Sequence, residues 1–226
     1  MEVRRIKSYV LRSGRMSDAQ KRSFRNLAPS FCISCEKKIT GYEDIFGNKN
    51  PVVIEIGFGS GSAAAEIAEK NPGINYLGIE VYRSGIGRLL WEIEKRRLEN
   101  VRIIEGDAVE ILGGILPLAG AAGFHIFFPD PWPKKRHHKR RLITRPFTDS
   151  LRECLKPGGY IYMVTDWEDY AGWALAELTA TKGLANQYGG FAVPLEWRPK
   201  TRFEIRGLGR DHKIFELYFL REKNEG

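Results

Sequence analysis

A strand, a tight turn and the start of a helix are predicted within one stretch, residues 52–61, and this stretch constrains the fold more than any other part of the chain. Its apolar residues run directly into Gly57, Gly59 and Gly61. Because glycine has no Cβ, the backbone of such a turn can take left-handed dihedrals and approach a ligand closely. We expect a nucleoside-like molecule to lie against this turn, although the same glycines would also suit a tight turn without a ligand.

The spacing of the glycines distinguishes between ligands. A dinucleotide-binding turn has the pattern Gly-x-Gly-x-x-Gly and directs a helix N-terminus at pyrophosphate, but Ser62 stands where its last glycine would be. Glu55 precedes the first glycine by two residues. A carboxylate there would repel pyrophosphate and attract an ammonium group. The sequence therefore favours a cationic nucleoside such as S-adenosylmethionine over NAD.

Two further acidic residues follow predicted strands. The apolar residues 74–79 end on Glu80, and residues 101–104 lead to Asp107 and Ala108. In a doubly wound sheet the carboxyl ends of adjacent strands line one crevice, and an acid after the second strand accepts hydrogen bonds from ribose hydroxyls. We expect Glu80 to bind the ribose and Asp107 to accept from an adenine amino group. The expected cofactor-binding residues are Glu55, Gly57, Gly59, Gly61, Glu80, Asp107 and Ala108.

Strand-like and helix-like segments alternate from about residue 46 onward. This alternation predicts βαβ units and a parallel sheet. The expected strands cover residues 52–56, 74–79, 101–104, 124–128, 160–164 and 217–220, and the expected helices cover residues 63–70, 86–97 and 147–155. We therefore predict an α/β domain over residues 46–226, with a mostly parallel, doubly wound sheet and a late antiparallel strand. His125 lies inside an apolar strand and is expected to be a core histidine.

Residues 1–45 lack sustained periodicity and mix basic residues with serine and glycine. We expect a basic, partly flexible arm that orders on binding. Its Cys32 and Cys35 have no second pair to complete a zinc site, so no metal is expected.

Basic residues are clustered along a chain of formal net charge +8. The clusters lie at residues 4–25, 134–141 and 198–210. Such density fits neutralisation of nucleic-acid phosphates, although basic runs also solubilise proteins or bind membrane surfaces. Because no amphipathic apolar face accompanies the cluster at 134–141, a membrane is disfavoured.

The sequence contains no apolar segment long enough to span a membrane. The longest weakly polar run, residues 111–124, is interrupted by Pro117 and glycines and is too short for a bilayer. No apolar core follows the charged first residues, so no secretory signal is expected. We expect a cytoplasmic protein.

The predicted strand at 124–128 leads into Pro129, Asp130, Pro131, Trp132 and Pro133. Each proline restricts its own φ and the residue before it, so this loop is stiff. It can hold the Asp130 carboxylate and the Trp132 indole beside the cofactor. Methyltransferases that act on exocyclic amines of bases have Asn/Asp-Pro-Pro followed by an aromatic residue here. A single proline separates Asp130 from Trp132, which weakens an amine assignment.

Five motifs together closely resemble the bacterial tRNA guanine-N7 methyltransferase family. They lie at residues 52–61, 127–134, 139–141, 165–168 and 201–204, and the resemblance extends from about residue 45 onward. It implies a Rossmann-like class I methyltransferase fold, S-adenosylmethionine as the cofactor, and guanine 46 in the variable loop of tRNA as the substrate. We expect a monomer or a homodimer.

The resemblance also implies site residues. Cofactor binding is carried onto Glu55, Glu80 and Asp107, and the catalytic position onto Asp130. The substrate-binding positions are Lys134, Asp166, Thr201 and Glu204, to which we add Lys139, Arg140 and Arg141 as phosphate contacts.

Three alternatives stay open from the sequence. One is a methyltransferase that acts on an exocyclic amine. Another is a noncatalytic RNA-binding protein, which would have no use for four converging carboxylates. The third, an NAD-dependent dehydrogenase, is disfavoured by Ser62.

Overall fold

A computed structural model describes residues 6–10, 14–36, 38–201, 204 and 213–223. Within these residues the chain forms one mixed sheet of seven strands in the order β3-β2-β1-β4-β5-β7-β6. The five strands from β3 to β5 are parallel, and β7 runs antiparallel to both β5 and β6. The strands are β1 (Val52–Ile56), β2 (Asn75–Glu80), β3 (Val101–Glu105), β4 (Ala121–Phe127), β5 (Leu155–Thr165), β6 (Leu184–Asn186) and β7 (Phe215–Arg221). The predicted doubly wound sheet with a late antiparallel strand is confirmed.

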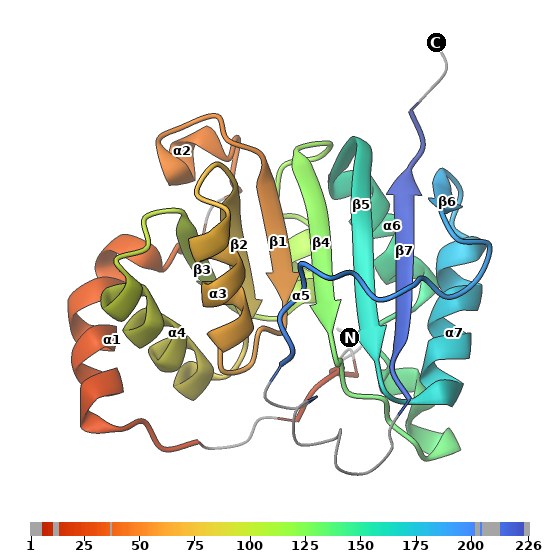
Figure 1. The fold of residues 1–226 in the computed structure, drawn as a ribbon, viewed down its shortest axis with the longest axis horizontal. Helices are drawn as coiled ribbons and strands as arrows, with labels where there is room; N and C mark the ends of the chain where they lie inside the picture. The colour runs from red at the N-terminus through yellow and green to blue at the C-terminus, as the bar shows by residue number, and fades with distance from the viewer. Residues whose placement is uncertain (1–5, 11–13, 37, 202–203, 205–212, 224–226) are drawn as a thin grey trace, which may run out of the picture.

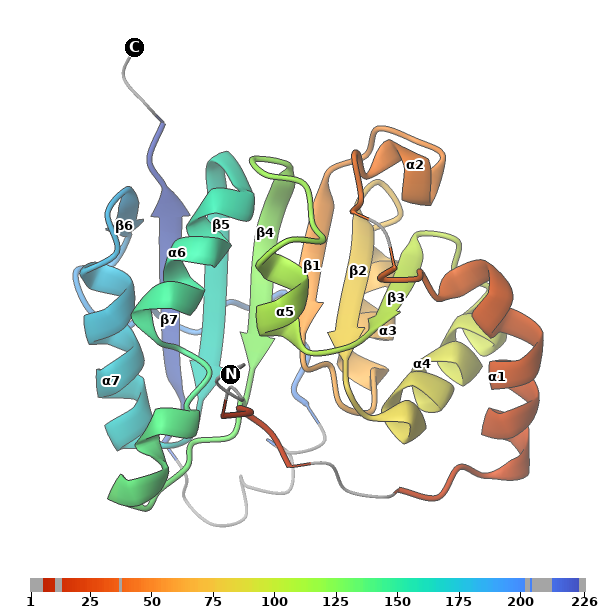
Figure 2. The same cartoon turned by 180° about the vertical axis from the view of Figure 1, so that it is seen from behind.

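Helices cover both faces of the sheet. In Figure 1, α3 and α4 lie in front of the sheet, whereas α5, α6 and α7 lie behind it, as the reverse view in Figure 2 shows. The helices are α1 (Asp18–Phe31), α2 (Glu43–Phe46), α3 (Ser62–Lys70), α4 (Arg83–Arg96), α5 (Ala108–Leu112), α6 (Arg145–Cys154) and α7 (Glu168–Thr179), with a 3-10 helix η1 (Lys135–Arg140).

Side-chain alternation along the central strands divides the core into two layers. Val53 packs with Ile67 and Leu89 on the α3/α4 side, and Ile54 packs with Leu151 on the other side. Since both faces of a parallel sheet are buried by crossover helices, its strands are apolar on both sides. This explains why β1 and β2 are continuous buried runs and not alternating ones.

His125 is a core residue, as predicted. It is 1 % exposed, and its Nε2 is 2.8 Å from the Tyr160 hydroxyl. Burial lowers the pKa of His125 to about 3, so the ring is neutral at physiological pH. Its ring stacks on Phe127.

The segment after β6 crosses the front face of the sheet (Figure 1). Ala192 forms a bridge with Glu216 of β7, and the Trp197 ring packs at 5.2 Å from His125 of β4. This crossing covers the part of the sheet that α3 and α4 leave open.

Within the arm that the sequence predicts to be partly flexible, residues 18–31 are helical. They form α1, which begins with a capping box between Ser17 and Gln20 and packs Phe24, Leu27 and Phe31 against the α4 side of the core. The capping box and the spacing of these apolar residues are signals that could have predicted the helix. The domain boundary near residue 45 stays a prediction.

Short elements account for most other differences from the predicted segments. The helix α5, the strand β6 and the 3-10 helix η1 were not expected, because periodicity is weak over three to six residues. The strand β5 begins earlier than the predicted strand at 160–164, because residues 155–159 also belong to it, and its pairing with β4 shifts register between Ala121 and Gly123.

The substitution Gly61→Ala tests how closely α4 packs against the glycine turn. Gly61 is the N-cap residue of α3 with φ 67°, and an added Cβ would lie 2.6 Å from the Cβ of Leu89. Gly47 is a matched control, because it has φ 69° and nothing within 4 Å of an added Cβ. Both alanine variants incur left-handed strain of about 1–2 kcal/mol, but only Gly61→Ala adds an overpacking cost of about 1–3 kcal/mol. Urea unfolding should therefore show the larger loss for Gly61→Ala, and equal losses would contradict this account.

Candidate active site at the carboxyl edge of the sheet

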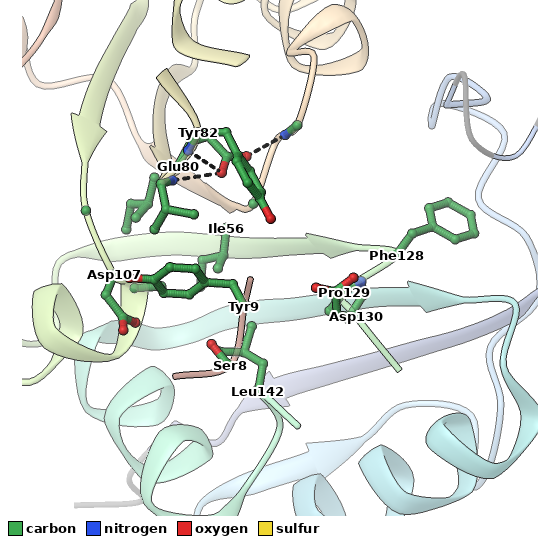
Figure 3. Close-up of a pocket in the computed structure, with 16 residues that line it drawn as sticks. Ser8, Tyr9, Ile56, Glu80, Tyr82, Asp107, Phe128, Pro129, Asp130 and Leu142 are labelled. Atoms are coloured by element: carbon green, nitrogen blue, oxygen red, sulfur yellow. Dashed lines mark hydrogen bonds between the residues drawn. The ribbon is translucent and has the colours of Figure 1, made fainter. Parts of the chain in front are cut away.

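A cavity of about 290 Å³ lies where the carboxyl ends of the central strands meet. Its lining includes residues from the loops after β1, β2, β3 and β4, and Figure 3 shows their side chains converging. The strand order reverses between β1 and β4, because β2 and β3 lie on one side of β1 and β4 and β5 on the other. Doubly wound sheets bind ligands at such a switch point.

The glycine turn presents bare backbone to this cavity. Gly57 and Gly59 line it with φ 73° and 57°, and an added Cβ at either position would meet nothing within 4 Å. Gly57 donates to the Ile79 carbonyl at 2.8 Å. The open space beside these two residues fits a ligand that lies directly on the backbone. Gly61 is different, because it packs against Leu89 and does not contribute to the lining.

Glu80 lines the cavity at the end of β2 and holds the glycine turn in place. Its carboxylate accepts from the backbone N–H of Gly59 at 2.8 Å, of Val81 at 2.7 Å and of Tyr82 at 3.1 Å. Burial raises the pKa of Glu80, the three backbone donors oppose this shift, and the nearby charge of Asp130 adds to it. Because a carboxylate has about four lone-pair sites, Glu80 retains capacity to accept from a ligand hydroxyl.

Asp107 and Ala108 line the cavity at the end of β3. Asp107 is 5 % exposed and caps α5 by accepting from the Val109 N–H at 3.0 Å. Ala108 is the first residue of α5. The start of this helix and the glycine turn therefore line the same cavity.

Glu55 does not line the cavity, which differs from the expectation that its carboxylate faces the turn directly. It shares a face of β1 with Val53 and is 5 % exposed. Burial, together with the charge of Glu80, raises the pKa of Glu55 to about 8. Its Oε2 has no hydrogen-bond partner among the described residues. A cation bound at the glycine turn would stabilise the ionised form of this buried carboxyl group.

The loop after β4 carries Asp130 to the rim of the cavity. Two non-glycine residues, Phe128 with φ 51° and Trp132 with φ 47°, are in the left-handed region on either side of it. Such conformations are strained and cluster at functional sites, where the surroundings hold them. Here Phe128 donates to the Val164 carbonyl at 2.8 Å, and the Pro131 carbonyl accepts from Arg141 at 3.1 Å. Asp130 itself is exposed and lines the cavity.

Arg141 holds this loop and does not form part of an exposed basic surface, so its prediction as a phosphate contact does not fit the structure. The side chain is 3 % exposed, pairs with Asp169 of α7, and packs over the rings of Tyr170 and Trp173 at 5.1 and 5.2 Å. Its positive charge is therefore paired with Asp169 and is not exposed to solvent.

The other basic residues of the 134–141 cluster are accessible. Lys134 and Lys139 are exposed, and Arg140 is half-buried with its guanidinium over the Trp132 ring at 5.0 Å. Because η1 places these residues next to the Asp130 loop, a polyanion bound to them would reach the cavity.

The predicted substrate acids differ in their availability. Asp166 is half-buried at the end of β5, outside the lining of the cavity. Glu204 is 5 % exposed and paired with Arg198 at 2.6 and 3.0 Å, while its backbone N–H donates to the Thr201 hydroxyl at 3.1 Å. Arg198 also contacts Glu216 at 3.1 Å. In the structure the Glu204 carboxylate therefore pairs with Arg198, which joins the segment after β6 to β7 through Glu216.

Several lining residues were not among the predicted site residues, and they include Ser8, Tyr9, Tyr82 and Leu142. The position of Tyr82, two residues after Glu80, is a signal that could have found it. Ser8 and Tyr9 are brought to the cavity by contacts with residues far along the chain, and no local pattern marks them.

The described residues contain neither a membrane-spanning helix nor a cluster of metal ligands. No helix in these ranges is long and apolar enough to cross a membrane. No group of three or more His, Cys, Asp or Glu side chains among the same residues could hold a metal ion.

The reversed strand order, the bare glycine turn and the acids at successive strand ends define a Rossmann-like class I methyltransferase that uses S-adenosylmethionine. Solved structures support the fold: 16S rRNA methyltransferase KamB matches with a TM-score of 0.59 at 16 % identity, over 97 % of this chain and 99 % of that chain. The aminoglycoside resistance methyltransferase NpmB1 matches with a TM-score of 0.52 at 18 % identity, over 82 % and 98 %.

Sequence comparison gives the family. Residues 49–217 match a family model described as "Putative methyltransferase". A tRNA (guanine-N(7)-)-methyltransferase of Thiobacillus denitrificans is 46 % identical over 96 % of both chains. One of Treponema pallidum is 44 % identical over 97 % of both. The chain belongs to this tRNA (guanine-N(7)-)-methyltransferase family, which confirms the resemblance seen in the sequence.

The pKa of Glu55 leads to a prediction about stability. Between pH 4.5 and about 8 the folded chain retains a proton on Glu55 that the unfolded chain releases. Folding therefore binds a proton in this range, and the free energy of unfolding falls as pH rises, by up to about 1.4 kcal/mol per pH unit from this group. Glu55→Gln should remove that part of the slope, measured by urea unfolding between pH 5 and pH 8. The exposed Glu153→Gln is the control, and identical slopes in all three proteins would rule out a buried neutral Glu55.

Proposed function

We propose that this protein transfers a methyl group from S-adenosylmethionine to N7 of the variable-loop guanine, guanine 46, of tRNA. The observation that carries the proposal is that Asp130 and the glycine turn line one cavity, beside the exposed lysines of η1. The names of the relatives in Thiobacillus and Treponema, which match over nearly their whole lengths, support the same substrate.

The residues assigned to the cofactor divide its binding among them. The backbone of Gly57 and Gly59 would hold the amino-acid part, and Glu80 would accept from the ribose hydroxyls. Asp107, with the neighbouring Ala108, would hold the adenine. Glu55 would act from behind the turn, where the positive charge of the bound cofactor would favour the ionised form of its buried carboxyl group.

The methyl transfer depends on the positioning of the two reactants more than on proton transfer. When bound, the cofactor supplies a methyl group on a sulfonium, and the lone pair of guanine N7 forms the new bond as the sulfur keeps the electrons of the old one. N7 carries no proton, so a general base is not needed. Positive charge develops on the guanine ring, and a carboxylate held nearby stabilises it. Asp130 is placed for that role, because its loop is held by Arg141 and by the Val164 carbonyl.

The substrate would be held by two kinds of residue. Lys134, Lys139 and Arg140 would contact phosphates, and Asp166 would accept from the N–H groups of the guanine Watson–Crick edge. Thr201 and Glu204 would support the substrate site indirectly, by anchoring the segment after β6, since the Glu204 carboxylate is already paired with Arg198. Such an enzyme acts in the cytoplasm, as a monomer or as a homodimer.

Product identification tests the proposal directly. Purified protein is incubated with radiolabelled S-adenosylmethionine and unmodified tRNA transcript, and the digested nucleosides are separated. Label in 7-methylguanosine is expected, and a transcript with guanine 46 replaced by adenine should accept none. Label in an N-methylated adenosine or cytidine would move the activity to the exocyclic-amine class, and tight tRNA binding without label would indicate an RNA-binding protein.

Asp130→Asn should separate catalysis from binding. The variant keeps the size of the side chain but loses its charge, so kcat is expected to fall about 100-fold. Affinity for S-adenosylhomocysteine, measured by calorimetry, should change less than threefold. Asp149→Asn on α6 is the control. Wild-type turnover by Asp130→Asn would remove this residue from the mechanism.

Two exposed lysines, Lys134 just before η1 and Lys139 within it, lead to a prediction about the salt dependence of tRNA binding. In a Lys134→Gln, Lys139→Gln double variant, tRNA affinity should fall, and the slope of log K against log salt concentration should decrease by roughly one to two units. The matched control is Lys156→Gln, Lys182→Gln, two exposed lysines at the opposite edge of the sheet. If both double variants keep the wild-type slope, η1 does not contact phosphates.

A further inference from the structure

Five residues near the start of the chain, residues 6–10, lie across the cavity. We call them the N-terminal strap. Ser8 and Tyr9 are half-buried and line the cavity, whereas Ile6 and Val10 are 44 % and 48 % exposed. The strap thus turns its two middle side chains inward and leaves its apolar ends in solvent, the reverse of what hydrophobicity alone favours. Its position must be set by specific contacts.

Those contacts are hydrogen bonds to the backbone carbonyls of the strap. The indole Nε1 of Trp132 donates to the Ser8 carbonyl at 2.9 Å, and the Tyr82 hydroxyl donates to the Val10 carbonyl. A weaker bond at 3.5 Å joins Arg140 to the Lys7 carbonyl. The three donors come from the loop after β4, from the residue just before α4, and from η1. Three separate elements around the cavity therefore hold one short segment over it.

The Tyr9 ring lies beside Asp107 (Figure 3). The Lys7 ammonium is 5.4 Å from the centre of the same ring, on the outer part of the strap. Lys7 is exposed, and its pKa is raised first by a hydrogen bond that its ammonium donates to Tyr9 and then by the charges of Tyr9, Glu110 and Asp107. The strap therefore brings an aromatic face to the same end of the cavity as Asp107, with a cation outside it.

We infer that Tyr9 is a cofactor-binding residue whose ring packs against the adenine of S-adenosylmethionine, and that the N-terminal strap is a wall of the cofactor site. The inference rests on the assignment of this cofactor and of Asp107 to its adenine. An aromatic ring and a purine stack favourably because both are flat and apolar on their faces. The amino group of the adenine would then meet the Asp107 carboxylate while its face meets Tyr9.

Calorimetry with S-adenosylhomocysteine tests the inference in the absence of tRNA and of turnover. Tyr9→Ala should bind about tenfold more weakly than wild type. Tyr9→Phe keeps the ring and should bind within threefold of wild type. Tyr188→Ala, an exposed tyrosine outside the cavity, should bind as wild type does. Unfolding temperatures of all variants confirm that the fold is retained, which is expected because Tyr9 is only half-buried.

Two results would overturn the inference. Unchanged affinity in Tyr9→Ala would mean that the ring does not contact the cofactor. Tighter binding would mean that the strap blocks the cavity and must move aside. A Trp132→Phe variant extends the test, because it removes the donor to Ser8 without altering the lining. Its affinity should fall severalfold, and wild-type affinity would overturn the role of Trp132 in holding the wall.

The experiment stands apart from the test of the proposed function. If wild-type protein binds S-adenosylhomocysteine but does not label tRNA, the tRNA substrate is wrong and the Tyr9 result is still interpretable. If tRNA is labelled at guanine N7 and Tyr9→Ala binds the product normally, only the strap inference fails.

Discussion

The carboxylate of Glu80 is the interaction on which the site depends. It accepts backbone hydrogen bonds from Gly59 on one strand-end loop and from Val81 and Tyr82 on the next. The turn after β1 and the start of α4 are thereby fixed relative to each other, and Gly85 of α4 fits against the Gly59 carbonyl with no room for a side chain. Charge-assisted bonds of this kind are stronger than neutral ones, so the bare backbone that faces the cavity does not collapse into it.

Two buried arginines play a similar role for the loops that complete the site. Arg141 joins the loop after β4 to α7 through Pro131 and Asp169. Arg198 joins the segment after β6 to β7 through Glu204 and Glu216. Each guanidinium has several hydrogen-bond partners, which include carboxylates, the Pro131 carbonyl, the His138 ring and the Tyr162 hydroxyl, and these partners make its burial tolerable. Positive charge in this protein thus serves two purposes, internal anchoring and an exposed surface, and sequence clustering alone does not separate them.

The sequence predicted what local patterns determine. Apolar runs, glycine spacing and acids at strand ends gave the central strands and placed Glu80, Asp107 and Asp130 correctly around one cavity. It did not predict the burial of Arg141 and Glu204, because that depends on partners 28 and 6 residues away in a packed arrangement. Nor could it place Glu55 behind the turn, since the direction of a side chain on a strand follows from which face the helices cover. The helix α1 was missed although its capping box was visible.

The Trp132 bond to Ser8 joins residues 124 positions apart in the chain. Contacts of such long range form late in folding, because the entropy of closing the intervening loop must be overcome first. During synthesis the strap leaves the ribosome before β4 and η1, so the Trp132 bond to it cannot form until they have followed. The glycine turn and its acids can assemble earlier, from residues 52–108 alone. The loops after β1, β2 and β3 can therefore come together first, and the strap completes the wall of the cavity last.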